Sequence, residues 1–303
     1  MTHTKINLAI ALTGLALMTG TTHAAIVAHY EFEETSGTVL VDSSGNNYDG
    51  SVVSSVGGAD LNVTGTVGSS AYQPYTGTGD RDANYGVVTQ TVATNFGISG
   101  NSARTISLWF NTSSFGDQQR LIGYGTGSAS QFDIVVENGS NANSGDGNIT
   151  TENRIGLRYG NGNVFFDADN SGNDFDINTW YHVAVVYDGT TMDLESIGTA
   201  SDGSGLSFYV NGGLVDTAAG NLGNPTQALT TALADFTFGI DSQKAAFTGE
   251  YTGLLDDVQI YNEALSATDV SSLYNNPGTV IPEPSSTALI GLAGLALFLR
   301  RRR

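Results

Sequence analysis

The chain has 303 residues, no cysteine and a formal net charge of −19. Without cysteine it can form neither a disulfide nor a thiolate metal site, and its acidic surface excludes nucleic acid and anionic membranes as electrostatic partners. Its 39 glycines and five prolines separate short runs of β-branched and aromatic residues, and 40% of its residues are hydrophobic, which is typical of an all-β domain with an ordinary core.

The first 24 residues have the order of a secretion signal. Lys5 supplies a positive charge, residues 6–18 are apolar, and Ala24 and Ala25 are small residues of the kind that precede a cleavage site. The apolar run is shorter than the roughly 20 residues that a membrane-spanning helix needs. We therefore expect a signal helix over residues 1–24, removed by signal peptidase after Ala24 or Ala25.

The first predicted strand, residues 26–33, is followed by a polar loop at residues 41–50. This loop holds two carboxylates, Asp42 and Asp49, with Ser, Asn and Gly between them. Oxygen-rich loops of this kind suit Ca²⁺, which takes six to eight oxygen ligands. A plain turn, in which Asp42 and Asn46 bond their own backbone, accounts for the same residues without a metal.

Strand-favouring runs then alternate with Gly, Asn and Ser turns as far as residue 261. The run at residues 180–187 is apolar on both faces, which predicts a central position in a sheet. The other strands are predicted at residues 70–73, 85–88, 104–111, 121–124, 132–137, 154–159, 163–167, 206–211, 214–216, 236–240 and 253–261.

The strand at residues 253–261 carries two adjacent acids, Asp256 and Asp257, although strands disfavour acids. Strict alternation would place Leu255 with Asp257 on one face, and Val258 with Ile260 on the other. A short helix should follow, because Ser266 is a natural N-cap three residues before Asp269.

The last 23 residues carry a second address. Pro282-Glu283-Pro284 precedes an apolar run, residues 288–299, and four arginines end the chain. The arginines would hold that end in the cytoplasm, and an ordinary tail anchor is the alternative. The order resembles the PEP-CTERM sorting signal of exopolysaccharide-forming Gram-negative bacteria. That resemblance implies a short transmembrane helix as a transient inner-membrane anchor, cleavage by an exosortase, and delivery to the cell surface or extracellular matrix.

Several stretches together resemble the laminin-G-like, concanavalin A-like domain family. They occur in the family's order at residues 28–34, 42–50, 105–110, 180–189, 208–212 and 253–262. The resemblance implies an all-β, two-sheet antiparallel jelly-roll sandwich over residues 25–276, with its first and last strands as neighbours. Residues 277–303 would hold the linker, sorting motif, helix and arginine tail. Residues 192–205 are an insertion relative to the family, and we expect them to protrude.

The resemblance also implies one structural Ca²⁺ near the first loop. Carried over to this chain, its ligands would be Asp42, carbonyl oxygens near Gly45 and Asn47, and Asp257. Asn47 stands where the family usually has Gly, and Asp257 where it usually has Glu. Asp257 would then tie the last strand to the Asp42 loop, directly or through the ion.

No carboxylate pair lies in the Glu-x-Asp-x-x-Glu or Glu-x-Asp-x-Glu pattern known from laminarinase-type enzymes, although acids at i and i+2 on a strand would have a suitable spacing. A retaining enzyme needs carboxylates about 5–5.5 Å apart, whereas Asp133 and Glu137 on one strand would lie about 13 Å apart at about 3.3 Å per residue. The i, i+2 pairs are Glu31/Glu33, on the opening strand, and Asp167/Asp169 and Asp174/Asp176, in loop-like sequence.

Neither His29 nor His182 follows a Gly-x-Ser-x-Gly elbow. We expect no enzyme, but an exported module that binds extracellular polysaccharide or a surface glycan. The alternatives are a matrix or adhesion protein without a small ligand, or a polysaccharide glycosidase or lyase.

Overall fold

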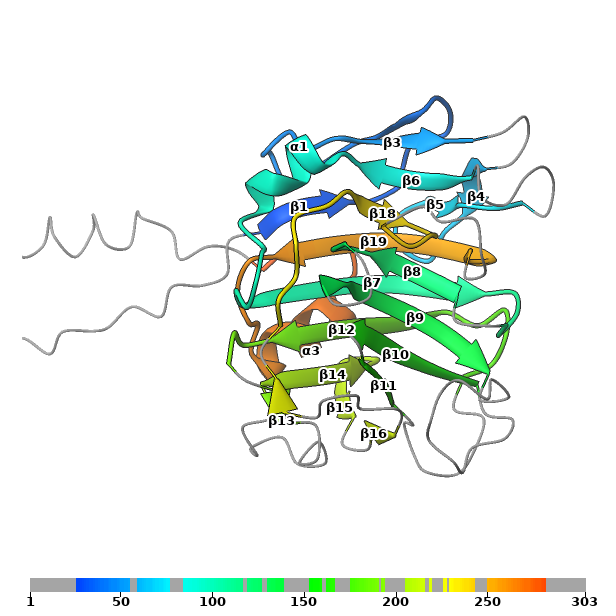
Figure 1. Ribbon diagram of the computed structural model, residues 1–303. Helices are drawn as coiled ribbons and strands as arrows, with labels where there is room; N and C mark the ends of the chain where they lie inside the picture. Colours follow the sequence, from blue (N-terminus) through cyan, green and yellow to red (C-terminus); the bar gives the residue numbers. More distant parts are fainter. Residues whose placement is uncertain are drawn as a thin grey trace, which may run out of the picture.

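The protein is a sandwich of two antiparallel sheets in the computed structural model (Figure 1). The predicted all-β, two-sheet class is confirmed. The predicted signal helix and C-terminal helix lie outside the described residues. Within the part that is described, no helix combines the length and apolar composition of a membrane span. The structure describes residues 26–54, 59–76, 84–116, 119–126, 130–138, 153–159, 162–166, 175–190, 192–193, 205–215, 218–219, 226–227, 229–242 and 250–281.

The first sheet contains the opening and closing strands of the domain. Within the described residues it has eight strands in the order β15-β14-β12-β7-β19-β5-β4, with β1 also paired to β19. These strands are β1 (Ile26–Tyr30), β4 (Asp60–Thr64), β5 (Ser70–Gln73), β7 (Arg104–Thr112), β12 (Tyr181–Tyr187), β14 (Leu206–Val210), β15 (Gly213–Val215) and β19 (Gly253–Tyr261).

The second sheet lies face to face with the first. Its nine described strands run in the order β16-β11-β10-β9-β8-β18-β6-β3-β2. They are β2 (Val39–Leu40), β3 (Gly50–Val53), β6 (Tyr85–Val88), β8 (Gln119–Gly123), β9 (Phe132–Asn138), β10 (Asn153–Tyr159), β11 (Gly162–Phe166), β16 (Ala218–Ala219) and β18 (Phe236–Phe238).

Short elements complete the described chain. They are α1 (Gln90–Ala93), η2 (Thr94–Phe96), α3 (Ala267–Asn275), and the paired strands β13 (Met192–Asp193) and β17 (Thr226–Gln227). Only the two ends of the predicted 192–205 insertion fall within the described residues, so its protrusion stays a prediction.

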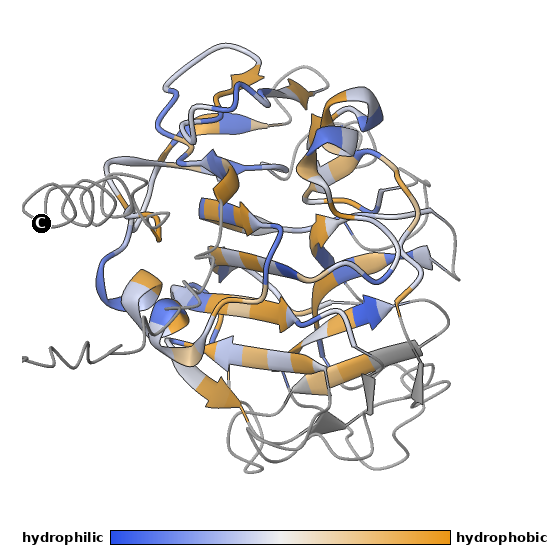
Figure 2. Cartoon of the chain, turned by 90° about the vertical axis from the view of Figure 1, so that its left-hand side faces the viewer, coloured by the Kyte–Doolittle hydropathy of each residue, from blue (hydrophilic) through white to orange (hydrophobic). Residues whose placement is uncertain are grey.

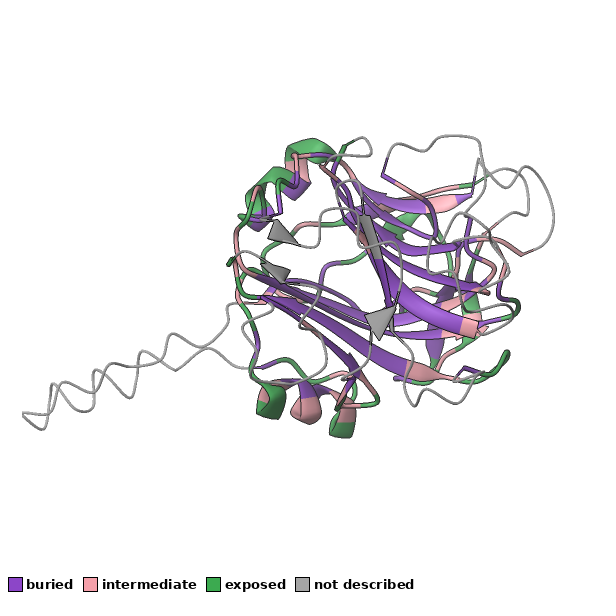
Figure 3. Cartoon of the chain, turned by 60° about the horizontal axis from the view of Figure 1, so that its bottom comes forward, coloured by how far each residue is buried: buried purple, intermediate pink, exposed green. Residues whose placement is uncertain are grey.

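The main core fills the space between the sheets, and most strand residues are buried (Figure 3). Hydrophobic and hydrophilic residues alternate along several strands (Figure 2), because one side of each faces this core. The central position predicted for β12 is confirmed. Val183 and Val185 face the main core, while Ala184 and Val186 belong to a second cluster on the opposite face.

The second cluster, called here the outer cluster, lies beneath α3. The predicted cap of this helix is confirmed: Ser266 and Asp269 form a reciprocal capping box. The described chain continues past α3 to Ile281, which is 7% exposed. The cluster comprises Ala184, Val186, Tyr209, Tyr261, Leu265, Val270, Leu273 and Ile281.

The prediction that the first and last strands are neighbours is confirmed. β1 runs antiparallel to β19, with Ile26 opposite Tyr261 and Tyr30 opposite Val258.

The strict alternation predicted along β19 is wrong. The register with β7 shifts between Asp256 and Gln259, and Asp257 has φ 47°. This bulge adds one residue, so Leu255 faces the main core together with Val258 and Ile260.

Candidate functional site

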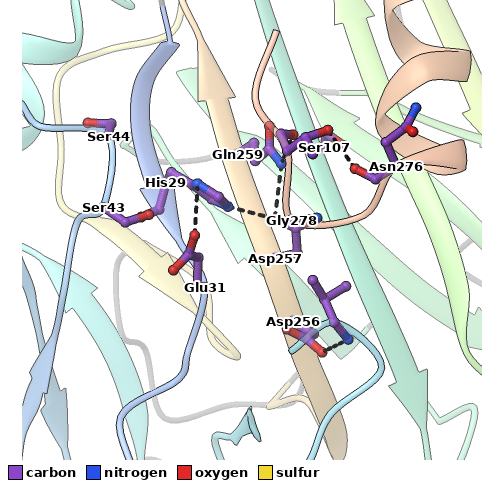
Figure 4. Close-up of polar contacts among 12 residues, drawn as sticks. His29, Glu31, Ser43, Ser44, Ser107, Asp256, Asp257, Gln259, Asn276 and Gly278 are labelled. Carbon is purple, nitrogen blue, oxygen red and sulfur yellow. Dashed lines mark hydrogen bonds and ion pairs between the residues drawn. The ribbon is translucent and has the colours of Figure 1, made fainter. Parts of the chain in front are cut away.

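His29 on β1 joins the first loop to the last strand (Figure 4). Its side chain is almost fully buried. Its backbone N–H donates to Asp42 Oδ1 (2.9 Å), and its ring Nε2 lies 2.6 Å from Asp257 Oδ1. The other ring nitrogen, Nδ1, lies 3.7 Å from Glu31 Oε1. Asp42 and Asp257, two of the predicted metal ligands, are therefore connected through one histidine.

Asp42 organises its own loop. Its Oδ1 also accepts a hydrogen bond from the backbone N–H of Ser44 (3.0 Å), and its Oδ2 accepts one from Tyr48 (2.9 Å). Its backbone N–H donates to Asp49 Oδ1 (2.8 Å). Three amide donors thus occupy the Asp42 carboxylate, which is the arrangement expected of a self-bonded turn.

The other two predicted ligands, Gly45 and Asn47, shape this loop. Both have left-handed backbone conformations, with φ of 92° and 59°. Asn47 can replace the family's usual Gly because Asn tolerates this region. The side-chain amide of Asn47 donates to the carbonyl of Gly45 (3.4 Å).

Asp256 and Asp257 have opposite electrostatic environments. Burial alone would raise the pKa of Asp257, but hydrogen bonds from His29, Gln259 and the backbone of Gly278, with the His29 charge, hold this pKa below its usual value. In contrast, burial raises the pKa of Asp256 to about 7, although its Oδ2 accepts hydrogen bonds from two backbone N–H groups of the 65–70 turn.

The predicted ligands do not fit a Ca²⁺ ion as they stand. The carboxylates of Asp42 and Asp257 each accept three hydrogen bonds from N–H groups, so a cation would have to compete with these donors for the oxygens. In the described part of the chain, no group of three or more His, Asp or Glu side chains could hold a metal. The calcium site therefore stays a prediction.

An open recess of about 250 Å³ lies beside this junction, called here the glutamate recess. It is lined by Glu31, Glu33, Glu34, Val41 and Ser43. Phe32, which lies between two of the glutamates, has its ring buried in the core and adopts φ 54°. A left-handed bulky residue is uncommon and is characteristic of strained functional turns.

The glutamates of the recess have different partners. Glu33 accepts hydrogen bonds from the backbone of Ser69 and Ser70 and from the Ser69 hydroxyl. Glu34 Oε1 accepts one from the backbone of Val41 (2.7 Å), while Glu34 Oε2 is buried and accepts none from the described residues. The exposed acceptor of the recess is therefore Glu31, whose side chain is 42% exposed, near the exposed side chain of Val41. The run Glu31-Phe32-Glu33-Glu34 was the sequence signal: strand alternation puts Glu31 and Glu33 on one face, but it does not predict that Glu34 joins them.

Charged side chains also line the outer face of the second sheet. The register of β9 and β10 places Glu137 opposite Arg154, and Asp133 opposite Arg158. Arg154 Nε donates to Glu137 Oε1 (2.9 Å), and its guanidinium lies 4.2 Å from the Phe165 ring centroid. Burial raises the pKa of Asp133 to about 7, against the opposing charges of nearby arginines.

Sequence reasoning did not find these arginines. Arg154 and Arg158 on β10 repeat the four-residue spacing of Asp133 and Glu137 on β9. This matched spacing predicts that opposite charges face each other in an antiparallel pair.

Family models match both parts of the chain. Residues 82–271 match the concanavalin A-like lectin/glucanases superfamily, and residues 280–303 match the PEP-CTERM protein-sorting motif. The chain belongs to the concanavalin A-like lectin/glucanases superfamily. The sorting motif marks it as an exported, cell-surface protein that is processed by an exosortase. A comparison with curated proteins gave no match.

Solved structures share the fold at low sequence identity. Domain 4 of AbnA, a GH43 extracellular arabinanase from Geobacillus stearothermophilus solved in complex with arabinotriose, has a TM-score of 0.52 and 19% identity, covering 83% of this chain and 98% of that domain. The botulinum neurotoxin serotype D binding domain has a TM-score of 0.51 and 17% identity, covering 84% of this chain. This chain spans only 52% of that neurotoxin domain.

Proposed function

We propose that the protein is an exported, non-catalytic module that binds neutral extracellular polysaccharide at the glutamate recess. The observation that carries the proposal is the recess itself, where acceptor oxygens lie beside an exposed aliphatic side chain. Small-ligand sites combine apolar surface with a few fixed polar groups. Sugar hydroxyl groups can donate hydrogen bonds to carboxylates, and the C–H faces of a sugar can pack on Val41. The arabinanase domain solved with arabinotriose supports a glycan ligand for this fold.

The charge of the domain favours a neutral glycan over an acidic one. Between residues 25 and 281, six Lys and Arg and 29 Asp and Glu give a net charge of 6 − 29 = −23. Three of the six basic residues, Arg120, Arg154 and Arg158, lie near buried acids on the second sheet. A uronate-rich polysaccharide would be repelled both by the whole domain and by the recess.

The environments of the candidate acids support a binding role rather than catalysis. Glu33, from one predicted i, i+2 pair, is held by the 69–70 turn. Asp133 and Glu137 lie opposite arginines on the neighbouring strand. A glycosidase needs two carboxylates directed at one glycosidic bond. The matrix or adhesion protein without a small ligand is the alternative.

Glycan binding by the mature domain tests the proposal. We expect retention by arabinan or another neutral polysaccharide and none by a uronate-rich one. Glu31→Gln with Ser43→Ala should weaken retention about tenfold or more, since the hydrogen bond to the charged acceptor Glu31 alone is worth about 1.5 kcal/mol or more. Glu263→Gln is the matched control, because residue 263 lies beyond the opposite end of the β1–β19 pair. Failure to bind any glycan would favour the matrix protein, and turnover of a glycan would favour the enzyme.

A further inference from the structure

The chain does not leave the domain freely after α3. Residues 276–281, called here the exit strap, follow the outer face of β19 in the same direction as the strand. The backbone N–H of Gly278 donates to Asp257 Oδ2 (3.0 Å). The side-chain amide of Gln259 donates to the carbonyl of Thr279 (3.0 Å). The backbone N–H of Ile281 donates to the hydroxyl of Tyr261 (3.1 Å). Three alternate side chains of one strand thus bind three backbone groups of the strap.

Packing and local geometry support the strap further. Ile281 is buried in the outer cluster beside α3. The hydroxyl of Tyr261 donates to Gln259 Oε1 (2.6 Å), which links two of the three attachments. Gly278 has φ 77°, and a Cβ there would lie 3.1 Å from Val67. The strap is therefore an integral, packed part of the folded domain.

The strap overlaps the sorting motif. The motif match begins at residue 280, so its first two residues belong to the strap. Enzymes that cut peptides bind an extended segment through its backbone N–H and C=O groups. Here those groups upstream of Pro282 are bound to β19 instead. We propose that the exit strap restrains exosortase processing, and that cleavage proceeds from molecules in which the strap has detached from β19.

This arrangement makes the processing rate depend on a local opening equilibrium. When opening and closing are fast relative to cleavage, the rate follows the population of the open form. Loss of one strap hydrogen bond should raise that population roughly fivefold. The inference concerns processing, so it stands or falls separately from glycan binding.

Tyr261→Phe in the full-length precursor tests the proposal, with processing followed by pulse-chase in a bacterium that contains an exosortase. We expect roughly fivefold faster conversion. Tyr124→Phe is the matched control, because it also removes a buried hydroxyl bonded to a carbonyl (Ile98, 2.7 Å) but lies away from the strap. This control should be processed at the wild-type rate.

A second variant leaves the folded domain untouched. Six Gly and Ser residues followed by a second copy of residues 280–281, inserted after Ile281, would leave the strap in place and give the enzyme an uninterrupted motif on a free segment, so we expect fast processing that Tyr261→Phe no longer accelerates. The proposal is overturned if Tyr261→Phe is processed no faster than the Tyr124→Phe control. It is equally overturned if the insertion does not accelerate processing.

Discussion

His29 and Asp257 are in direct contact, although they lie near opposite ends of the domain's sequence. The ring Nε2 of His29 lies 2.6 Å from Asp257 Oδ1, although 228 positions separate the two residues in sequence. The contact ties the first strand of the domain to its last, because β1 and β19 carry the two side chains. Each of the two residues binds one further segment. The backbone N–H of His29 donates to Asp42 in the first loop, and Asp257 accepts a hydrogen bond from Gly278 in the exit strap.

Asp257→Ala should lower the free energy of unfolding by about 3 kcal/mol or more, because it leaves buried donors of His29, Gln259 and Gly278 without their shared acceptor. Urea denaturation measures the change. Asp176→Ala is the control, since Asp176 is exposed and should change the stability by less than about 0.5 kcal/mol. A loss below about 1 kcal/mol for Asp257→Ala would contradict a closing role.

His182 should make the domain less stable in acid. Burial lowers the pKa of His182 to about 4, although the charge of Asp257 opposes the shift, and its Nε2 lies 2.8 Å from Ser107 Oγ. Its unfolded pKa is about 6.5, so between these values the unfolded chain binds a proton that the folded chain does not. Stability is fully present above about pH 6.5 and falls by up to about 3 kcal/mol as the pH drops towards 4.

Urea denaturation of the wild type and of His182→Gln, each measured across this pH range, tests the role of His182. The variant should lose less stability than the wild type between pH 6.5 and 4, since its side chain cannot titrate. Parallel curves for the two proteins would show that His182 is not neutral and buried in solution.

Calcium titration of thermal unfolding tests the predicted metal site. With the oxygens of Asp42 and Asp257 turned towards N–H donors, we expect added Ca²⁺ to leave Tm unchanged relative to Mg²⁺ at equal ionic strength. Binding at a hundredfold excess over Kd would instead raise the free energy of unfolding by about 2.7 kcal/mol. That result would support the predicted site and would mean that the ion competes successfully with these N–H donors.

Arg154 and Glu137 should stabilise the second sheet as a pair. Removing one leaves a buried charge, so Arg154→Leu should lower the free energy of unfolding by about 3 kcal/mol. In a Glu137→Leu background the same change should cost about 2 kcal/mol less. Equal costs in the two backgrounds, measured by denaturant unfolding, would rule out the coupling.

Local patterns predicted the order of strands, the central position of β12 and the capping box of α3, because each depends on neighbouring residues. They could not predict the bulge at Asp257, since one left-handed residue reverses the faces of all residues before it. His29 gave no signal either, because its partner lies on a strand that only the closed fold brings near. The resemblance placed Asp42 and Asp257 near each other, but not the histidine between them.

The exit strap also fixes how the domain faces its surroundings. Tyr261 lies opposite Ile26 and binds Ile281, so both ends of the described chain meet at one end of the β1–β19 pair. The glutamate recess lies beyond the other end of β1, past Tyr30. The last described residue, Ile281, and the recess therefore lie at opposite ends of the β1–β19 pair. If residues 282–303 anchor the precursor as the sequence predicts, the recess would lie at the end of the domain away from the membrane before release.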